Sequence, residues 1–342
     1  MRGTDEAVAF IETLCGTPSP TGFTAGAEAY LMDTLKGMGY APQHTRKGTV
    51  TCYLGGEGDP LLLSAHVDTL GGMVRAVKPN GRLRYTQVGG YNDNAIENEN
   101  CLVHTRGGRV YSGTVQPTKA SRHVYGDITE LKRDDETLEI VLDEMVKSAE
   151  DVKALGIAAG DFLSWDARTV VTESGFIKSR HLDDKASSGV LLALARLIKD
   201  GEVAPARAVY VMFTVYEEVG HGASGSLPAD FTDMIAVDMG CVGDDLSCDE
   251  TMVSICAKDS AGPFNYDLTN ELIALARENG LRYAVDIYPK YSSDTATALR
   301  AGLEARHALI GPGVFASHGY ERTHRLGVEN TLGLLCAFVG KR

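Results

Sequence analysis

Long apolar runs that end in charged residues dominate the hydrophobic pattern of this chain. In the clearest case, the run at residues 208–215 is followed, after Tyr216, by the adjacent carboxylates Glu217 and Glu218 and then by glycines. A run without polar alternation predicts a strand buried on both faces of a sheet. Two acids at the end of such a strand are costly unless a cation or a proton holds them, so the pattern indicates a functional site.

Helical and strand patterns alternate in the first and last parts of the chain. Such alternation predicts an α/β fold with a mostly parallel sheet sandwiched by helices. The expected helices are residues 5–15, 25–38, 185–199, 270–279, 295–301 and 329–339. The expected strands are residues 50–54, 61–65, 169–172, 208–215, 234–237, 253–257 and 283–288.

The hydrophobic pattern changes between residues 72 and 165, where turn-forming residues separate short runs of alternating apolar and polar positions. Asn80-Gly81 lies between two such runs and predicts a β-hairpin. We therefore expect residues 72–165 to be a small β-rich domain inserted into one α/β domain made of residues 1–71 and 166–342. Further strands are expected within the insertion at residues 109–115 and 138–142, and a solvated loop at residues 132–136.

Composition narrows the class of protein. The chain of 342 residues has a formal net charge of -13, which argues against nucleic acid or an anionic membrane surface as a partner. Its seven cysteines form no CxxC pair, as expected for buried thiols in a reducing compartment. No secretory signal and no apolar run of membrane-spanning length is evident, so we expect a cytoplasmic protein.

Histidine and carboxylate residues recur at the ends of the predicted strands. Because sites in open α/β sheets form beyond the carboxyl ends of the strands, these side chains are expected to converge. Imidazole and carboxylate suit zinc or cobalt, and two such ions can activate a water molecule for a nearby general base. The candidates are His66 and Asp68, Asp183 and Asp184, Glu217 and Glu218, Asp238, and His318.

Each of these signals has an ordinary structural alternative when it is taken alone. An HxD motif occurs often by chance, and paired glutamates are common on solvated helices. Asp238 could cap a helix, and His318 could be a surface residue with His324 as a rival for its role. His221 could face the same cleft as Glu218. The order and spacing of the whole set carry the hypothesis.

The set of motifs resembles the M42 family of metallopeptidases, which are aminopeptidases with two co-catalytic metal ions. The matching segments are SAHVDTLGGMV, IAAGDFL, HLDDKASSG, VYEEVG, AVDMG, SSDTATAL and SHGYE. The resemblance implies a zinc-exopeptidase-like fold and two divalent ions per subunit, zinc or cobalt, with manganese as a further candidate. It also implies peptide substrates and a homo-oligomer, since the family assembles into tetrahedral dodecamers.

The resemblance further implies how the metal ligands divide between the two ions. One ion would be held by His66, Asp183 and Asp238. The other would be held by Asp183, Glu218 and His318, so that Asp183 bridges the two.

The remaining roles implied by the resemblance concern catalysis and substrate. Glu217 would be the general base for hydrolysis of N-terminal residues from peptides, and Asp68 would orient His66. Asp294 would line the substrate site. The inserted domain would mediate assembly or control substrate access.

The chain departs from the usual family pattern beside the expected site. Thr69 stands where the family has glutamate, Tyr216 where it has glutamine, and Lys185 where it has arginine. Residues 221–224 replace Leu-Arg-Gly-Ala. These departures bear on specificity, so Tyr216 and His221 are candidate substrate contacts. Their pattern resembles an M42 branch associated with the N-acetylglutaminylglutamine amide osmoprotectant system.

The sequence also leaves two alternatives to an aminopeptidase, a deacylase or amidase and a non-catalytic scaffold. An M20-type deacylase or amidase, acting on an acylated dipeptide or osmolyte, uses the same ligand types, but its extra domain follows the third ligand. Here the insertion lies between Asp68 and Asp183, which favours the M42 arrangement. A non-catalytic scaffold is expected to lose a ligand or the base, and all of them are present.

Overall fold

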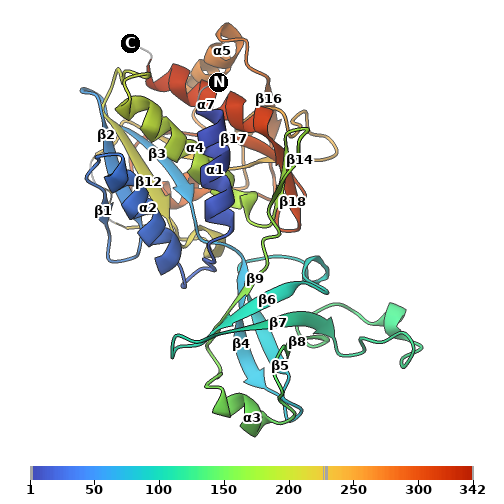
Figure 1. Ribbon diagram of the computed structural model, residues 1–342. Coiled ribbons are helices and arrows are strands. Elements are labelled where there is room, and N and C mark those ends of the chain that lie inside the picture. Colours follow the sequence, from blue (N-terminus) through green and yellow to red (C-terminus); the bar gives the residue numbers. More distant parts are fainter. Residues whose placement is uncertain (1–2, 226, 228–229, 341–342) are drawn as a thin grey trace. The chain divides into compact units, whose positions relative to one another are not determined.

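The structure is a computed structural model that describes residues 3–225, 227 and 230–340 (Figure 1). The chain divides into two compact units. Residues Met1–Asp68 and Arg168–Arg342 form one, here called the α/β unit, and Thr69–Ala167 form the other, here called the barrel unit. Within the described residues, no helix is both long and apolar enough to cross a membrane.

Four neighbouring strands form the centre of the 12-stranded sheet of the α/β unit. In spatial order they are β12 (Val209–Thr214), β3 (Leu61–His66), β13 (Asp233–Val237) and β17 (Arg306–Phe315). Each pairs with the next in parallel, and every residue of β3 and β13 is buried. The parallel, doubly covered core predicted from the apolar runs is confirmed, and it brings the carboxyl ends of these strands to one edge.

The remaining strands extend the sheet on both sides, and most of them pair antiparallel with their neighbours. They are β1 (Gln43–His44), β2 (Val50–Gly55), β10 (Val170–Val171), β11 (Phe176–Ser179), β14 (Gly240–Val242), β15 (Val253–Lys258), β16 (Tyr283–Ile287) and β18 (Glu321–His324).

Helices cover the sheet as the periodicity predicted. Helices α1, α4 and α7 pack against one another, and α4 and α7 also pack against the central strands (Figure 1). Helix α4 is buried along nearly its whole length, and Gly189 permits its close contact with α1, because a Cβ there would lie 2.5 Å from Cγ1 of Ile11. The helices are α1 (Thr4–Cys15), α2 (Ala25–Gly37), α4 (Leu182–Lys199), α5 (Tyr266–Glu278), α6 (Asp294–Arg300) and α7 (Arg325–Val339).

The central strand β17 had no counterpart among the strands expected from the sequence. Its sequence contains Gly311-Pro312-Gly313, which normally predicts a turn. In the structure these glycines permit close backbone contacts. A Cβ on Gly311 would lie 1.8 Å from the carbonyl oxygen of Asp238, and one on Gly313 would lie 2.2 Å from that of Asp249.

The barrel unit is a closed barrel with the strand order β4-β5-β8-β7-β6-β9. The predicted hairpin at Asn80-Gly81 joins β4 and β5, with the Lys78 amide donating to the Arg82 carbonyl at 2.8 Å. Its core includes Tyr85 and Trp165, whose rings meet edge to face. The elements are β4 (Gly71–Val77), β5 (Leu83–Val88), β6 (Asn100–His104), β7 (Val110–Pro117), β8 (Leu138–Leu142), α3 (Ala149–Ala154) and β9 (Phe162–Trp165).

Candidate metal centre

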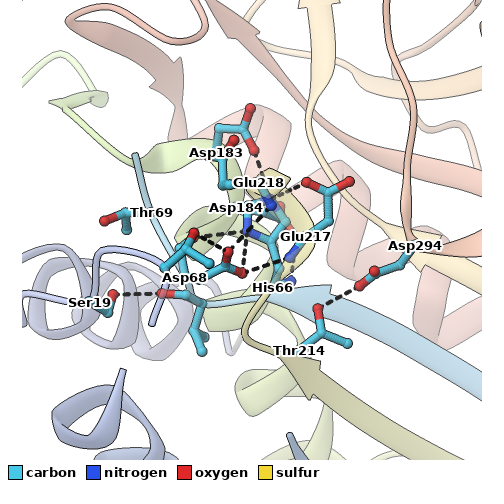
Figure 2. Close-up of polar contacts among 12 residues, drawn as sticks. Ser19, His66, Asp68, Thr69, Asp183, Asp184, Thr214, Glu217, Glu218 and Asp294 are labelled. Carbon is cyan, nitrogen blue, oxygen red and sulfur yellow. Dashed lines mark hydrogen bonds and ion pairs between the residues drawn. The ribbon is translucent and has the colours of Figure 1, made fainter. Parts of the chain in front are cut away.

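The candidate ligands lie beyond the carboxyl edge of the central strands. His66 is the last residue of β3, and Asp238 directly follows β13. Glu217 and Glu218 begin a short 3-10 turn, η3 (Glu217–Val219), just after β12. Figure 2 shows the side chains of His66, Glu217 and Glu218 pointing toward one another and toward Asp183 at the start of α4.

Two groups of ligand atoms form there, and Asp183 belongs to both. His66, Asp183 and Asp238 each offer an atom within 4.8 Å of the others, and so do Asp183, Glu218 and His318. The Nε2 atom of His66 lies 3.0 Å from Oδ1 of Asp183, whereas Nε2 of His318 lies 3.4 Å from Oδ2. The two oxygens of one carboxylate thus face two different histidines, which is the arrangement that a bridging ligand needs.

The electrostatics of these groups fit bound cations. Burial raises the pKa of Asp238 to about 7, with the neighbouring Asp183 charge adding to the effect, and burial likewise raises the pKa of Glu218. The Oε1 atom of Glu218 is buried without a hydrogen-bond partner among the described residues. Crowded carboxylates with an orphaned oxygen are stabilised by a divalent ion, and the mixed nitrogen and oxygen donors suit one.

Asp183 behaves differently from its neighbours. Burial acts to raise its pKa, but hydrogen bonds from His318 and His66 outweigh burial and hold the pKa well below its usual range. Asp183 therefore remains an anion between the two histidines, as a shared ligand must.

Glu217 lies beside the two ligand groups but belongs to neither of them. Its Oε2 atom is 3.9 Å from Nε2 of His66, and its side chain is 16% exposed, against 3% for Glu218. Burial raises the pKa of Glu217, and the charges of Asp238 and Asp294 reinforce the shift. A raised pKa in a buried cluster of charged groups makes Glu217 a candidate functional residue.

Comparison with known proteins identifies the family. A family model described as M42 glutamyl aminopeptidase matches residues 48–334. The chain belongs to the M42 family. Its members are hydrolases that act on peptide bonds, and this chain is an enzyme of that class.

Relatives of this M42 peptidase include the putative aminopeptidase YhfE of Bacillus subtilis (strain 168), which is 40% identical over 99% of both chains. A TET aminopeptidase from Thaumarchaeota archaeon SCGC AB-539-E09 shares the fold with a TM-score of 0.89 and 18% identity, covering 98% of this chain and 96% of that one. The Pyrococcus horikoshii TET1 peptidase has a TM-score of 0.86 and 20% identity, covering 98% of this chain and all of that one.

Buried carboxylates outside the two ligand groups hold the backbone of the ligands in place. Glu321 accepts hydrogen bonds from the amides of Asp183 at 3.0 Å and of His318 at 2.9 Å. Asp184 accepts one from the amide of His66 at 3.2 Å. Spacing in the sequence gave no signal for Glu321, and Asp184 was a candidate without a role.

Asp68 contacts the imidazole of His66 through its backbone and its side chain. The Nδ1 atom of His66 lies 3.0 Å from the backbone carbonyl oxygen of Asp68 and 3.6 Å from its carboxylate. The carboxylate also accepts from the amides of Glu217 at 3.2 Å and Glu218 at 3.3 Å (Figure 2). The Thr21 hydroxyl donates to the same carboxylate at 2.7 Å. Asp68 thus holds the turn that carries both glutamates.

Asp294 also stabilises this region through hydrogen bonds. Its two carboxylate oxygens accept from the Thr214 hydroxyl at 2.5 Å and from the Ala223 amide at 2.8 Å, and the residue is buried. The ring of Tyr216 stacks on that of His221, with centroids 4.8 Å apart. The segment after the paired glutamates therefore folds back on itself, and the Ala223 amide joins it by a hydrogen bond to Asp294, the first residue of α6.

His324, the rival of His318, has a separate structural role. It is the N-cap residue of α7, and its Nδ1 atom accepts from the Leu326 amide at 3.0 Å. Its Nε2 atom lies 2.9 Å from the Ser174 carbonyl oxygen. His318 is the histidine that reaches the carboxylates, with its left-handed backbone held by Glu321.

Proposed function

We propose that this M42 peptidase is a dinuclear metal-dependent aminopeptidase. The single observation that carries the proposal is the sharing of Asp183 by two ligand groups, with a separate glutamate beside them. His66, Asp183 and Asp238 would hold one ion, and Asp183, Glu218 and His318 the other. Zinc or cobalt suits this donor set, and manganese is a further candidate.

Bound divalent ions would supply Lewis-acid chemistry, polarising the scissile carbonyl and lowering the pKa of a water molecule. Glu217 would act as the general base, taking the proton of the attacking water and passing it to the leaving amine. Its raised pKa suits this role, because a base must also return the proton. Asp68 and Asp294 keep the segment around Glu217 in place during these transfers.

Exopeptidase action would follow from recognition of the free α-amine of the peptide at the metal centre. The free α-amine could become a ligand of a bound ion, which a blocked amine cannot. Tyr216 and His221, with Asp294 behind them, would line the side of the site next to Glu217 and bear on specificity.

A substrate panel tests the proposed function. The metal-loaded protein would be assayed on aminoacyl amides, on their N-acetylated forms and on acylated dipeptide amides. We expect kcat/KM for the free amines to exceed that for the acetylated forms by at least about 100-fold, since losing a charged contact in a buried site costs roughly 3 kcal/mol.

Equal or faster turnover of the N-acetylated substrates would contradict the aminopeptidase proposal. Preference for acylated dipeptide amides would instead support the deacylase alternative raised by the residues around the glutamates. No turnover of any substrate by protein with its full complement of metal would support the scaffold alternative.

The oligomeric state is a further part of the proposal. The solved P. horikoshii TET1 peptidase assembles into a tetrahedron or a large octahedral shell, and another TET1 structure is a dodecamer. We propose a homo-oligomer for this chain as well, with the barrel unit mediating assembly or substrate access.

A further inference from the structure

Lys47 reaches the segment that follows the paired glutamates from a distant part of the chain. Its Nζ atom donates to the carbonyl oxygens of Gly222 at 2.8 Å and Ser224 at 2.9 Å, and it also contacts the carbonyl oxygen of His221. The Ser224 hydroxyl is 3.1 Å away. One ammonium group thus binds four acceptors from three residues, His221, Gly222 and Ser224, in the loop 215–224 that follows β12.

We propose that Lys47 is a positioning residue for the turn that carries Glu217. By binding the carbonyl groups of His221, Gly222 and Ser224, its side chain would hold the second half of the loop and so position the general base. The inference rests on the proposed role of Glu217, because the loop positions a catalytic group only if Glu217 is the general base.

The turn that presents Lys47 is itself held in place. Between β1 and β2, the Thr45 amide donates to the Thr49 carbonyl and the Gly48 amide to the Thr45 carbonyl. Gly48 has a left-handed backbone, and a Cβ there would lie 3.0 Å from a methyl group of Val215 and 2.8 Å from a carboxylate oxygen of Glu28. The turn therefore packs directly against the residue at the start of the loop, which gives the lysine a rigid base.

Lys47 complements the two carboxylates that bind the same loop. Asp68 accepts the amides of Glu217 and Glu218, and Asp294 accepts the amide of Ala223. Lys47 supplies the opposite polarity by donating to the carbonyl groups of the same loop. The two carboxylates thus bind amide groups of the loop, and Lys47 binds its carbonyl groups. Together these contacts hold the loop along its length.

A direct role for Lys47 in binding a substrate carboxylate fits the contacts less well. A lysine ammonium has three N–H donors and no acceptor. Here four acceptors of the loop lie within reach of those donors, and the Tyr216 ring centroid lies 5.8 Å from the nitrogen. All of its donor capacity is directed at the protein, so positioning is the role that the geometry supports.

The test uses the variants Lys47→Met and Lys47→Arg, with Lys199→Met as a matched control. Lys199 also donates to a backbone carbonyl, that of Gly39 at 2.8 Å, and also lies over a tyrosine ring, but it is at the far end of α4. The measurements are kcat and KM on a good aminoacyl amide, bound metal per subunit, and hydrogen exchange of amides 217–224.

Lys47→Met is expected to lower kcat by about 10-fold with KM within about 2-fold, because small misplacement of a catalytic group slows the chemical step. Its 217–224 amides should exchange faster, and its metal content should be unchanged. Lys47→Arg, which keeps the charge and several donors in a different geometry, should retain an intermediate kcat. Lys199→Met should match the wild type in all three measurements.

Three results would overturn the inference: a Lys47→Met variant with wild-type kcat and exchange, a change in KM alone, or equal losses in the arginine and methionine variants. If Lys47→Met does not fold, the arginine variant and the exchange data still decide. Failure of the proposed function is separate. It would show as full activity of a Glu217→Gln variant, whereas loop exchange tests the contact of Lys47 independently of catalysis.

Discussion

Replacing Glu217 by glutamine is expected to lower kcat for peptide hydrolysis by about 10²–10⁴-fold, the usual contribution of a general base. Glutamine keeps the size and shape of the side chain but accepts no proton at neutral pH. Because Glu217 lies outside both ligand groups, the variant should still bind its metal ions. Its KM should change little, because the loss falls on the chemical step.

Two further variants make this test specific. Glu218→Gln alters a proposed ligand, so we expect it to lower the bound metal as well as kcat. Glu304→Gln changes an exposed glutamate that belongs to neither ligand group and should behave as the wild type. Steady-state kinetics and elemental analysis of the same preparations separate these cases. A Glu217→Gln protein that turns over peptide at the wild-type rate would remove Glu217 from the mechanism.

Removing metal is expected to make the protein less stable as the pH rises from about 6.5 to 8.5. In the folded metal-free protein, burial raises the pKa of Asp238 to about 7 and that of Glu321 to about 8, and burial also raises the pKa of Glu218. In the unfolded chain these carboxyl groups titrate near pH 4. The folded state therefore binds more protons, and its stability is lost as the pH rises through the folded pKa values.

Asp183 contributes with the opposite sign but outside this range. Its pKa is lowered in the folded state, so its contribution is present above about pH 4 and is lost only in acid. Lys185, whose pKa burial lowers to about 8, opposes the loss only at the top of the range, so the raised carboxyl groups dominate between pH 6.5 and 8.5. The expected loss is on the order of 3 kcal/mol, or roughly 5 °C in the melting temperature.

Thermal melts of chelator-treated and metal-loaded protein at several pH values measure this effect. Metal binding favours ionised ligands, so added metal should stabilise the protein more at pH 8.5 than at pH 6.5. An Asp238→Asn variant without metal should lose part of the pH dependence. A metal-free melting temperature that is constant or rises across this range would show that the buried carboxylates do not carry the assigned charges.

The sequence pattern predicted the strand-end part of the site because of a simple geometric rule. His66, Glu217, Glu218 and Asp238 each follow a buried run, and parallel strands bring such positions to one edge. His318 follows β17, which the sequence did not predict as a strand because it contains Gly311-Pro312-Gly313. Its place came only from the resemblance to the family.

The contacts that support the site were beyond reach of the sequence. Lys47 binds carbonyl groups near residue 222, and Glu321 binds the amide of Asp183; both contacts join segments far apart in the chain, so no periodicity or spacing predicts them. Asp68 shows the limit of a short motif. The motif predicts a contact between its carboxylate and the imidazole of His66, and the two groups lie 3.6 Å apart. The motif does not predict that the backbone carbonyl oxygen of Asp68 also contacts the imidazole, nor that the carboxylate accepts from the amides of Glu217 and Glu218.

Counting the metal ions that activity requires tests the two-metal account most directly. Metal-free protein would be titrated with Zn²⁺ or Co²⁺ while bound metal per subunit and turnover of an aminoacyl amide are measured together. The account predicts two ions per subunit at full activity, and a His318→Ala variant that holds one ion tightly with most activity lost. Full activity with a single ion, or turnover by protein that holds none, would contradict it.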